Sequence, residues 1–232
     1  MLLNDGSELV FRVREHPRAR RVRIVVSRHD GMVVTIPRGF DRSRIAEILE
    51  QKRNWIERTL RRLPMKPEPY RPPVRIVLQA VGEEWTVEYE TGNPRHVTLV
   101  KRGDRMLRVS GAIDRPDVVR RVLGRWLTIQ AQRHLVPWLH RTADELGFTL
   151  KGASVRTQRT LWGSCSRRRT ISLNARLLLI PPDMVRYVFV HELAHTRHMN
   201  HSREFWQAVA IHVPDYRDRV RELKRLWSAL EI

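Results

Sequence analysis

The feature that most constrains this chain is a largely apolar segment that ends in two histidines four residues apart. Residues 184–190 lead directly into His191-Glu192-Leu193-Ala194-His195. This pattern predicts a buried helix, on which positions i and i+4 share one face, so both imidazoles can reach a single ion. Glu192 is displaced around the helix, and its carboxylate can approach a water on that ion without binding the metal.

A catalytic zinc needs a third protein ligand and one position open for water. His201 follows His191 by ten residues, the spacing found in HExxHxxGxxH metalloproteases. His198 occupies the glycine position of that motif, so we expect the chain to reverse at Asn200, because asparagine tolerates the left-handed conformation. His198 is the alternative ligand, but on a continuing helix it lies ~10 Å along the axis from His191. We therefore predict a Zn²⁺ site with three histidine ligands and a glutamate as general base: His191, His195, His201 and Glu192.

The charge of the chain is strongly basic, with a formal net charge of +19 and a pI near 11.4. Such a field attracts nucleic acid, acidic proteins or anionic surfaces. Only five of the 44 basic residues are lysine. This arginine bias could reflect a GC-rich genome and a merely solvated surface as easily as the recognition of phosphate by an anion-binding face. Nucleic acid is therefore a possible partner through the basic surface.

Cysteine usage and the absence of apolar spans bear on the compartment. Cys165 is the single cysteine, so no intramolecular disulfide forms, and we assign it no role, because a lone cysteine is more often a small buried hydrophobe. The first residues lack a basic stretch followed by an apolar one, and no apolar run approaches the ~18 residues of a membrane span. We predict a cytoplasmic protein with no membrane partner.

The periodicity of the first half indicates strands with one helix. Alternating or β-branched residues predict strands near 22–26 and 32–36 and within 74–81, 85–89, 97–100 and 106–109. Between them, Asp41 or Ser43 is expected to cap a helix that reaches Leu60, and prolines from Pro64 to Pro73 predict an extended connector.

Helical periodicity dominates after residue 114. A helix is expected from Val118 to Leu146, kinked or interrupted before Pro137. A short strand region is expected within 154–174, followed by helices over roughly 182–199 and 203–229.

Motifs along most of the chain resemble the YgjP-like metallopeptidase family, which is related in its zinc motif to the SprT and WLM proteases. The resemblance rests on Val188-Phe189-Val190-His191-Glu192-Leu193-Ala194-His195, Asn200-His201-Ser202, Phe205-Trp206, Leu161-Trp162-Gly163-Ser164-Cys165-Ser166, Ile171-Ser172-Leu173-Asn174, Pro214-Asp215-Tyr216, and the first-half segments 33–37 and 52–56. Leu161 stands where the family usually carries arginine, so a polar role of that side chain is in doubt here.

The resemblance implies an α+β fold with a zincin-like HExxH helix domain and a β-rich N-terminal part. We expect residues 1–112 to form a β-rich N-terminal subdomain with one helix and a proline-rich connector, and residues 113–232 the zincin-like catalytic domain. The family's metal ligands fall on His191, His195 and His201, and its base on Glu192. Trp162 and Gly163 are expected beside the motif helix, where an extended peptide can add to a strand edge; core packing is an equal interpretation for Trp162.

The expected function is a zinc-dependent metallopeptidase, possibly acting on nucleic-acid-associated proteins. Two alternatives remain open. One is a metal-dependent phosphoanhydride hydrolase, in which arginines neutralise nucleotide phosphates. The other is a nucleic-acid-binding protein with a vestigial zinc motif, which predicts salt-sensitive DNA binding unaffected by chelators. Tyr216 after Pro-Asp is interpreted as structural and left out of the site.

Overall fold

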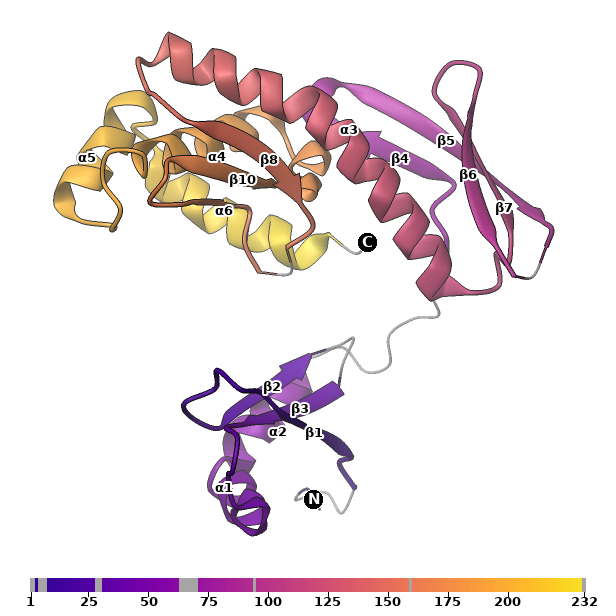
Figure 1. Ribbon diagram of the computed structural model, residues 1–232, viewed down its shortest axis with the longest axis vertical. Helices are drawn as coiled ribbons and strands as arrows, with labels where there is room; N and C mark the ends of the chain where they lie inside the picture. Colours follow the sequence, from indigo (N-terminus) through magenta and orange to yellow (C-terminus); the bar gives the residue numbers. More distant parts are fainter. Residues whose placement is uncertain are drawn as a thin grey trace. The chain divides into compact units, whose positions relative to one another are not determined.

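The computed structural model describes residues 3, 8–27, 31–62, 71–93, 95–158 and 160–230. The chain divides into two compact units, Met1–Tyr70 and Arg71–Ile232. Both units contain helices and strands, and strands are frequent in the first half of the sequence (Figure 1). The α+β fold with a β-rich N-terminal part is therefore confirmed.

The first unit is a three-stranded sheet with helices packed on one face. The strand order is β1-β3-β2, with β1 parallel and β2 antiparallel to the central β3. Every second residue of β3 points toward the helices, and these side chains form a buried core with apolar residues of the helices. The core consists of Met32, Val34 and Ile36 of the strand and Ile45, Leu49 and Ile56 of the helices. The elements are β1 Phe11–Glu15, β2 Arg23–Ser27, β3 Gly31–Ile36, α1 Ile45–Gln51 and α2 Arg53–Arg62.

The helix predicted to reach Leu60 is two helices that meet at Lys52. Asp41 caps a 3-10 turn before α1, accepting a hydrogen bond from the Ser43 main-chain N–H at 2.9 Å. The structure therefore selects Asp41 over Ser43 as the cap. The prolines between 63 and 70 lie outside the described residues, as do residues 28–30.

The second unit begins with a four-stranded sheet of order β4-β5-β7-β6. β5 and β7 are parallel, and the outer pairs are antiparallel. The four strands predicted between 74 and 109 are confirmed, as β4 Arg75–Leu78, β5 Glu83–Thr91, β6 Val97–Arg102 and β7 Met106–Gly111.

A single long helix, α3 Pro116–Glu145, joins this sheet to the C-terminal elements (Figure 1). Trp126 in its first half meets Trp85 of β5 edge to face at 5.2 Å, and Trp138 in its second half meets Phe189 of α4 in the same way. The four-stranded sheet thus shares a compact unit with the residues that follow it, and the compact units divide between residues 70 and 71 rather than between 112 and 113.

Of the kink or interruption expected before Pro137, the interruption does not occur, and α3 continues through the proline. A proline inside a helix removes one main-chain hydrogen bond and costs about 3 kcal/mol. Leu135 and Leu139 on either side are fully buried, and burying a leucine side chain contributes about 1.5–3 kcal/mol. Packing of the two leucines therefore offsets the cost of the proline.

The C-terminal part is a three-stranded sheet of order β8-β10-β9 with three helices. β10 lies in the centre, parallel to β8 and antiparallel to β9, so β9 is an edge strand. The elements are β8 Gly152–Arg156, β9 Gly163–Cys165, β10 Thr170–Asn174, α4 Pro182–Ala194, α5 Arg203–His212 and α6 Tyr216–Ala229.

The single helix predicted over 203–229 is wrong, because α5 ends at His212 and α6 begins at Tyr216. Pro214 separates them: it has no N–H to donate and disfavours helical geometry in the preceding Val213, whose φ of −140° and ψ of 83° are not helical. In the described part of the chain, none of the helices combines the length and apolar character that a membrane crossing requires.

Candidate metal centre

Helix α4 brings the motif into the core of the second unit. It starts with Pro182 in the first turn, where the missing N–H costs nothing, and its apolar residues are almost fully buried. Phe189 and Leu193 have no exposed surface. Burial on several sides fixes the rotation of the helix, and that rotation sets the directions of His191 and Glu192.

The helix ends at Ala194, about one turn earlier than predicted. Thr196 follows, and its hydroxyl donates to the Leu193 carbonyl at 2.7 Å, which competes with continued main-chain pairing. His198 therefore lies beyond the end of α4, and the prediction that the helix continues to residue 199 and includes His198 is wrong. The predicted left-handed turn at Asn200 is also wrong, because the only described non-glycine residues with positive φ are Arg105 and Arg169.

The reversal nevertheless returns His201 to the two motif histidines. Ring nitrogens of His191, His195 and His201 all lie within 4.8 Å of one another. The Nε2 atoms of His191 and His201 are 3.2 Å apart. Two nitrogens bound at 2.0–2.1 Å to one tetrahedral ion lie about 3.3–3.4 Å apart, so this pair already has the spacing of two zinc ligands. His198 does not belong to this group.

Hydrogen bonding and burial leave these rings ready to bind a cation. Nδ1 of His195 lies 2.9 Å from the main-chain carbonyl oxygen of His198. A carbonyl oxygen only accepts, so Nδ1 carries the proton and Nε2 keeps its lone pair for a metal. Burial, with the neighbouring His195 and His201, lowers the pKa of His191 to about 3. Its ring is therefore neutral, which is the form that binds metal ions.

Aromatic side chains of α5 hold the rings in place. Ser202 caps this helix, and Phe205 stacks on His195 with ring centroids 4.4 Å apart. Trp206 stacks on His201 at 5.5 Å, and Tyr216 stacks on Trp206 at 4.9 Å. Sequence reasoning left Tyr216 out of the site, and spacing alone gave no signal for this stack because its members come from different helices.

Glu192 is packed against the edge strand. It is 5% exposed, and its Oε2 atom is buried without a hydrogen-bond partner among the described residues. Burial raises the pKa of Glu192 to about 8. A Cβ atom built on Gly163 would lie 2.8 Å from Oε1 of Glu192, so only glycine leaves room for the carboxylate here. A buried carboxyl group poised to exchange a proton lies next to the three rings.

The segment before β9 is anchored by a buried asparagine. Asn174 has no exposed surface, and its Nδ2 donates to the main-chain carbonyl of Leu161 at 2.7 Å. The main-chain N–H of Asn174 donates to the carbonyl of Trp162 at 2.8 Å. The Trp162 ring packs edge to face on Trp227 of α6 at 4.7 Å, an arrangement typical of packing. Sequence reasoning noticed Asn174 only as part of a motif and missed this role.

Cys165 lies on the same strand but is not part of the cluster of converging ligand atoms. Burial, together with the nearby Glu192 charge, raises the pKa of the Cys165 thiol to about 11. The free thiol is therefore protonated at neutral pH.

The contact between Gly163 and Glu192 leads to a testable prediction. Gly163→Ala is expected to displace the Glu192 carboxylate and lower kcat/KM by roughly 100-fold, because a shift of about 1 Å in a catalytic group has this effect. Metal content should not change, since the histidines are not touched. Gly152→Ala is the matched control: Gly152 lies in β8 of the same sheet, and a Cβ there meets nothing within 4 Å. Equal activity of the two variants would contradict the prediction.

The site combines two imidazoles on a buried helix, a third imidazole that follows that helix and an adjacent carboxyl group. This combination is typical of metal-dependent hydrolases of the HExxH class. Residues 20–226 match the YgjP-like metallopeptidase domain, and the chain belongs to this family. This confirms the resemblance inferred from the motifs.

No curated protein matches the chain. Among solved structures, the chain is similar to the metallopeptidase zymogen abylysin of Pyrococcus abyssi, with 27% identity and a TM-score of 0.34, over 40% of this chain and 90% of that chain.

Proposed function

We propose that this protein is a zinc-dependent metallopeptidase that hydrolyses peptide bonds with Glu192 as general base. The observation that carries the proposal is the convergence of three histidine ring nitrogens within 4.8 Å, next to a buried glutamate. An all-imidazole donor set suits zinc, and three ligands leave a fourth position for water. His201 is exposed, so the site is open to solvent on this side. We also propose that the metal is zinc and that the protein is cytoplasmic.

The roles of the residues follow from their surroundings. His191, His195 and His201 would hold the ion, which when bound lowers the pKa of water toward about 7 and polarises the scissile carbonyl. The positive charge of the bound ion would favour the carboxylate form of Glu192, which accepts the proton of the attacking water and delivers it to the leaving amine. The Gly163 contact restrains the Glu192 carboxylate, so the base is oriented before substrate arrives.

The edge strand supports a peptide as the substrate. β9 pairs with β10 on one side only, and its first residue, Gly163, contacts Glu192. An extended peptide that adds to the other side of β9 gains main-chain hydrogen bonds and passes close to the base. In this proposal Gly163 contributes backbone to substrate binding, and Trp162 fixes the strand by packing on Trp227. The net charge of +19 favours proteins associated with nucleic acid as the substrate class.

Metal analysis tests the first half of the proposal. Protein purified without an affinity tag and dialysed at neutral pH is expected to contain about one zinc per chain, because one three-histidine cluster occurs among the described residues. Mass spectrometry of the metals in the protein measures this ratio. Protein that remains metal-free after incubation with zinc would contradict it.

A paired substrate assay tests the second half. Zinc-loaded protein is expected to degrade casein, to lose this activity with a chelator and to regain it with zinc. Release of phosphate from nucleotides is measured in parallel. Phosphate release without casein cleavage would favour a phosphoanhydride hydrolase. Inactivity in both assays, with DNA binding that a chelator leaves unchanged, would favour the vestigial-motif alternative.

A further inference from the structure

The first unit carries a concentration of positive charge that the metal centre does not use. Residues 11–23 contain one carboxylate, Glu15, and six arginines. The arginines are Arg12, Arg14, Arg18, Arg20, Arg21 and Arg23. All six arginines are exposed. The segment spans β1, the connector and the start of β2, so its charges are placed by the sheet rather than by a flexible tail.

The strand register puts three of these arginines on one face. Arg14 and Arg23 are both paired with Thr35 of the central strand, one from each side. Arg12 lies two residues before Arg14 and therefore on the same face, about 6.7 Å away. The opposite face carries the buried core, including Met32 and others of β3. We call the open face with Arg12, Arg14 and Arg23 the basic sheet face.

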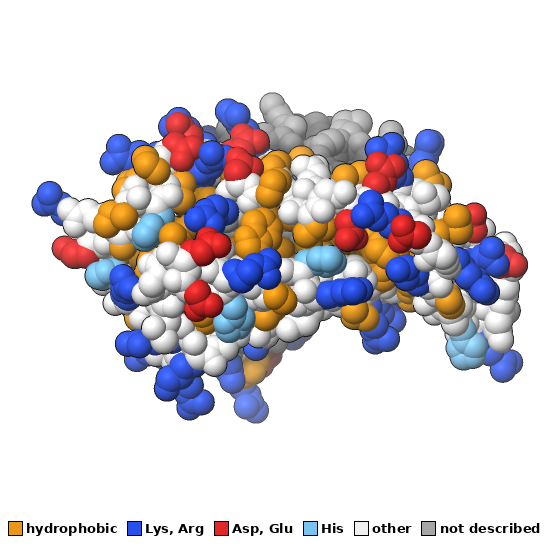
Figure 2. Space-filling model, turned by 90° about the horizontal axis from the view of Figure 1, so that it is seen from above, with side chains coloured by type: hydrophobic (Ala, Val, Ile, Leu, Met, Phe, Trp, Pro, Cys, Tyr) orange, Lys and Arg blue, Asp and Glu red, His pale blue; other side chains and the backbone are white. Residues whose placement is uncertain are grey.

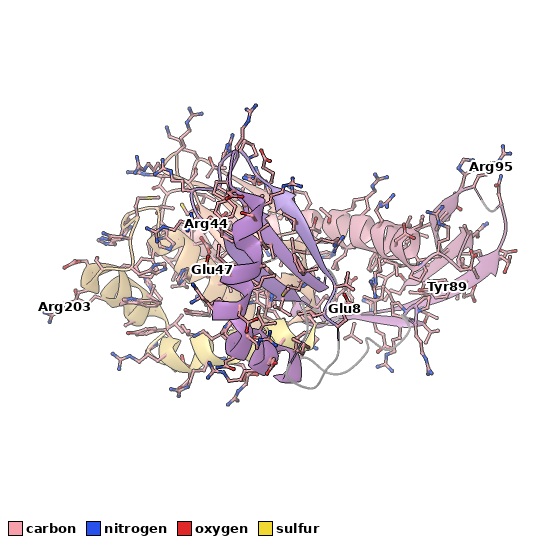
Figure 3. All side chains as sticks on the ribbon, turned by 90° about the horizontal axis from the view of Figure 1, so that it is seen from below. Glu8, Arg44, Glu47, Tyr89, Arg95 and Arg203 are labelled. Carbon is pink, nitrogen blue, oxygen red and sulfur yellow. The ribbon has the colours of Figure 1, made fainter. Side chains whose placement is uncertain are left out.

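The residues of β1, β2 and β3 put no carboxylate on this face, and the exposed Glu8 lies three residues before β1. Glu15 alternates to the other side of β1, with Phe11. Within the described strand residues of the unit, no other acidic side chain occurs. The acidic residues of the ordered helices, such as Glu47, belong to the helical side, which Figure 3 marks with Arg44 and Glu47. The two sides of this unit therefore differ in charge.

Ion pairing shows the same contrast. On the helices, arginines pair with acidic residues one turn away, as in Arg53–Glu50, Arg121–Asp117, Arg221–Asp218 and Arg225–Glu222. The face drawn in Figure 2 likewise shows basic side chains interspersed with acidic ones. Among the described residues, Arg14 and Arg23 form no ion pair with a carboxylate.

The connector extends the basic sheet face at one end. It joins β1 to β2 next to the row formed by Arg14 and Arg23, and it carries the other three arginines. Its backbone is tied down, because the main-chain N–H of His16 donates to the Ile36 carbonyl at 3.0 Å and that of Ala19 donates to the His16 carbonyl at 3.0 Å. Because this part of the backbone is held in place, binding an anion needs to order mainly the arginine side chains.

We propose that the basic sheet face and its connector bind the sugar–phosphate backbone of a nucleic-acid duplex. Guanidinium groups match phosphate geometry, and a row of them meets successive phosphates of a polyanion. The side chains between the arginines are small, such as Val25 and Val33, so no aromatic platform for unstacked bases is present on the described part of this face. Binding is therefore to the backbone of paired strands and independent of sequence. The same lack of large apolar side chains disfavours insertion into a membrane.

The experiment uses the full chain and does not depend on hydrolysis. Anisotropy of a labelled DNA duplex of about 30 base pairs is measured over a salt series. Arg14→Glu/Arg23→Glu is expected to weaken binding at least tenfold at about 100 mM salt, and to make the slope of log K against log salt shallower by about 1.8, or 0.9 for each lost phosphate contact. Arg221→Glu/Arg225→Glu makes the same change in net charge on α6 and is expected to weaken binding less than about threefold.

Circular dichroism and thermal unfolding establish that both double variants are folded. Equal weakening by the two pairs would overturn the proposal, because net charge and not this face would then control binding. Absence of duplex binding by the unchanged chain at low salt would also overturn it, as would preference for vesicles of anionic phospholipid or for polyglutamate over the duplex. None of these outcomes depends on whether the protein cleaves casein, so this proposal and the peptidase proposal fail separately.

Discussion

Glu192→Gln is expected to abolish nearly all hydrolysis, with a loss of roughly 10²–10⁴-fold in kcat, while zinc content and fold are retained. The amide has the size and shape of the carboxyl group, so it fits the same space beside Gly163. It cannot take up the proton of the attacking water. The histidine rings are unchanged, so the ion remains bound. Turnover of casein and zinc content are measured on the same preparations.

Glu145→Gln is the matched control for this substitution. Glu145 ends α3, is exposed and pairs with Arg186 at 3.2 Å on the surface. Its replacement is expected to leave turnover within about twofold, because an exposed ion pair contributes about 0–1 kcal/mol to stability and nothing to the chemistry. Undiminished turnover by the Glu192 variant would remove this residue from the mechanism.

The second large effect is expected at His201. His201→Ala removes one of three converging ligand atoms and should weaken zinc binding by more than about 100-fold, since removal of a group that only supports a ligand already costs 10–100-fold. Hydrolysis should be lost with the metal. Zinc affinity is measured by competition with a chromophoric chelator.

His198→Ala is the comparison that separates the two candidate third ligands. The His198 side chain is not part of the cluster, and its main-chain carbonyl, which accepts from Nδ1 of His195, survives the substitution. Most of the bound zinc should therefore remain. Loss of zinc from the His198 variant with retention in the His201 variant would reverse the assignment of the third ligand.

Local sequence signals were sufficient where one element determines the outcome. The apolar run into His191 predicted a buried helix, and α4 is one. Alternation predicted the four strands between residues 75 and 111, because side-chain period 2 is a property of a single strand. The motifs also identified the family, which the match over residues 20–226 confirms.

Helix boundaries were predicted less well because several weak preferences compete at each end. Thr196 stops α4 through its bond to Leu193, although the histidine spacing suggested a longer helix. Pro214 divides the last helical region into α5 and α6. The proline is visible in the sequence, but the prediction gave more weight to the apolar periodicity on both sides of it. At Pro137 the proline does not end the helix, because buried leucines on both sides keep α3 continuous.

The sequence by itself determined which side chains could meet a metal: the i, i+4 spacing of His191 and His195 fixes their common face on any helix, and His201 follows at a distance that allows its return. Only the tertiary structure decided how the site is completed. The turn that returns His201, the stacking of Trp206 on its ring and the seating of Glu192 against Gly163 join residues from separate elements. Such contacts depend on how helices and strands pack against one another, and periodicity within one element carries no information about that packing.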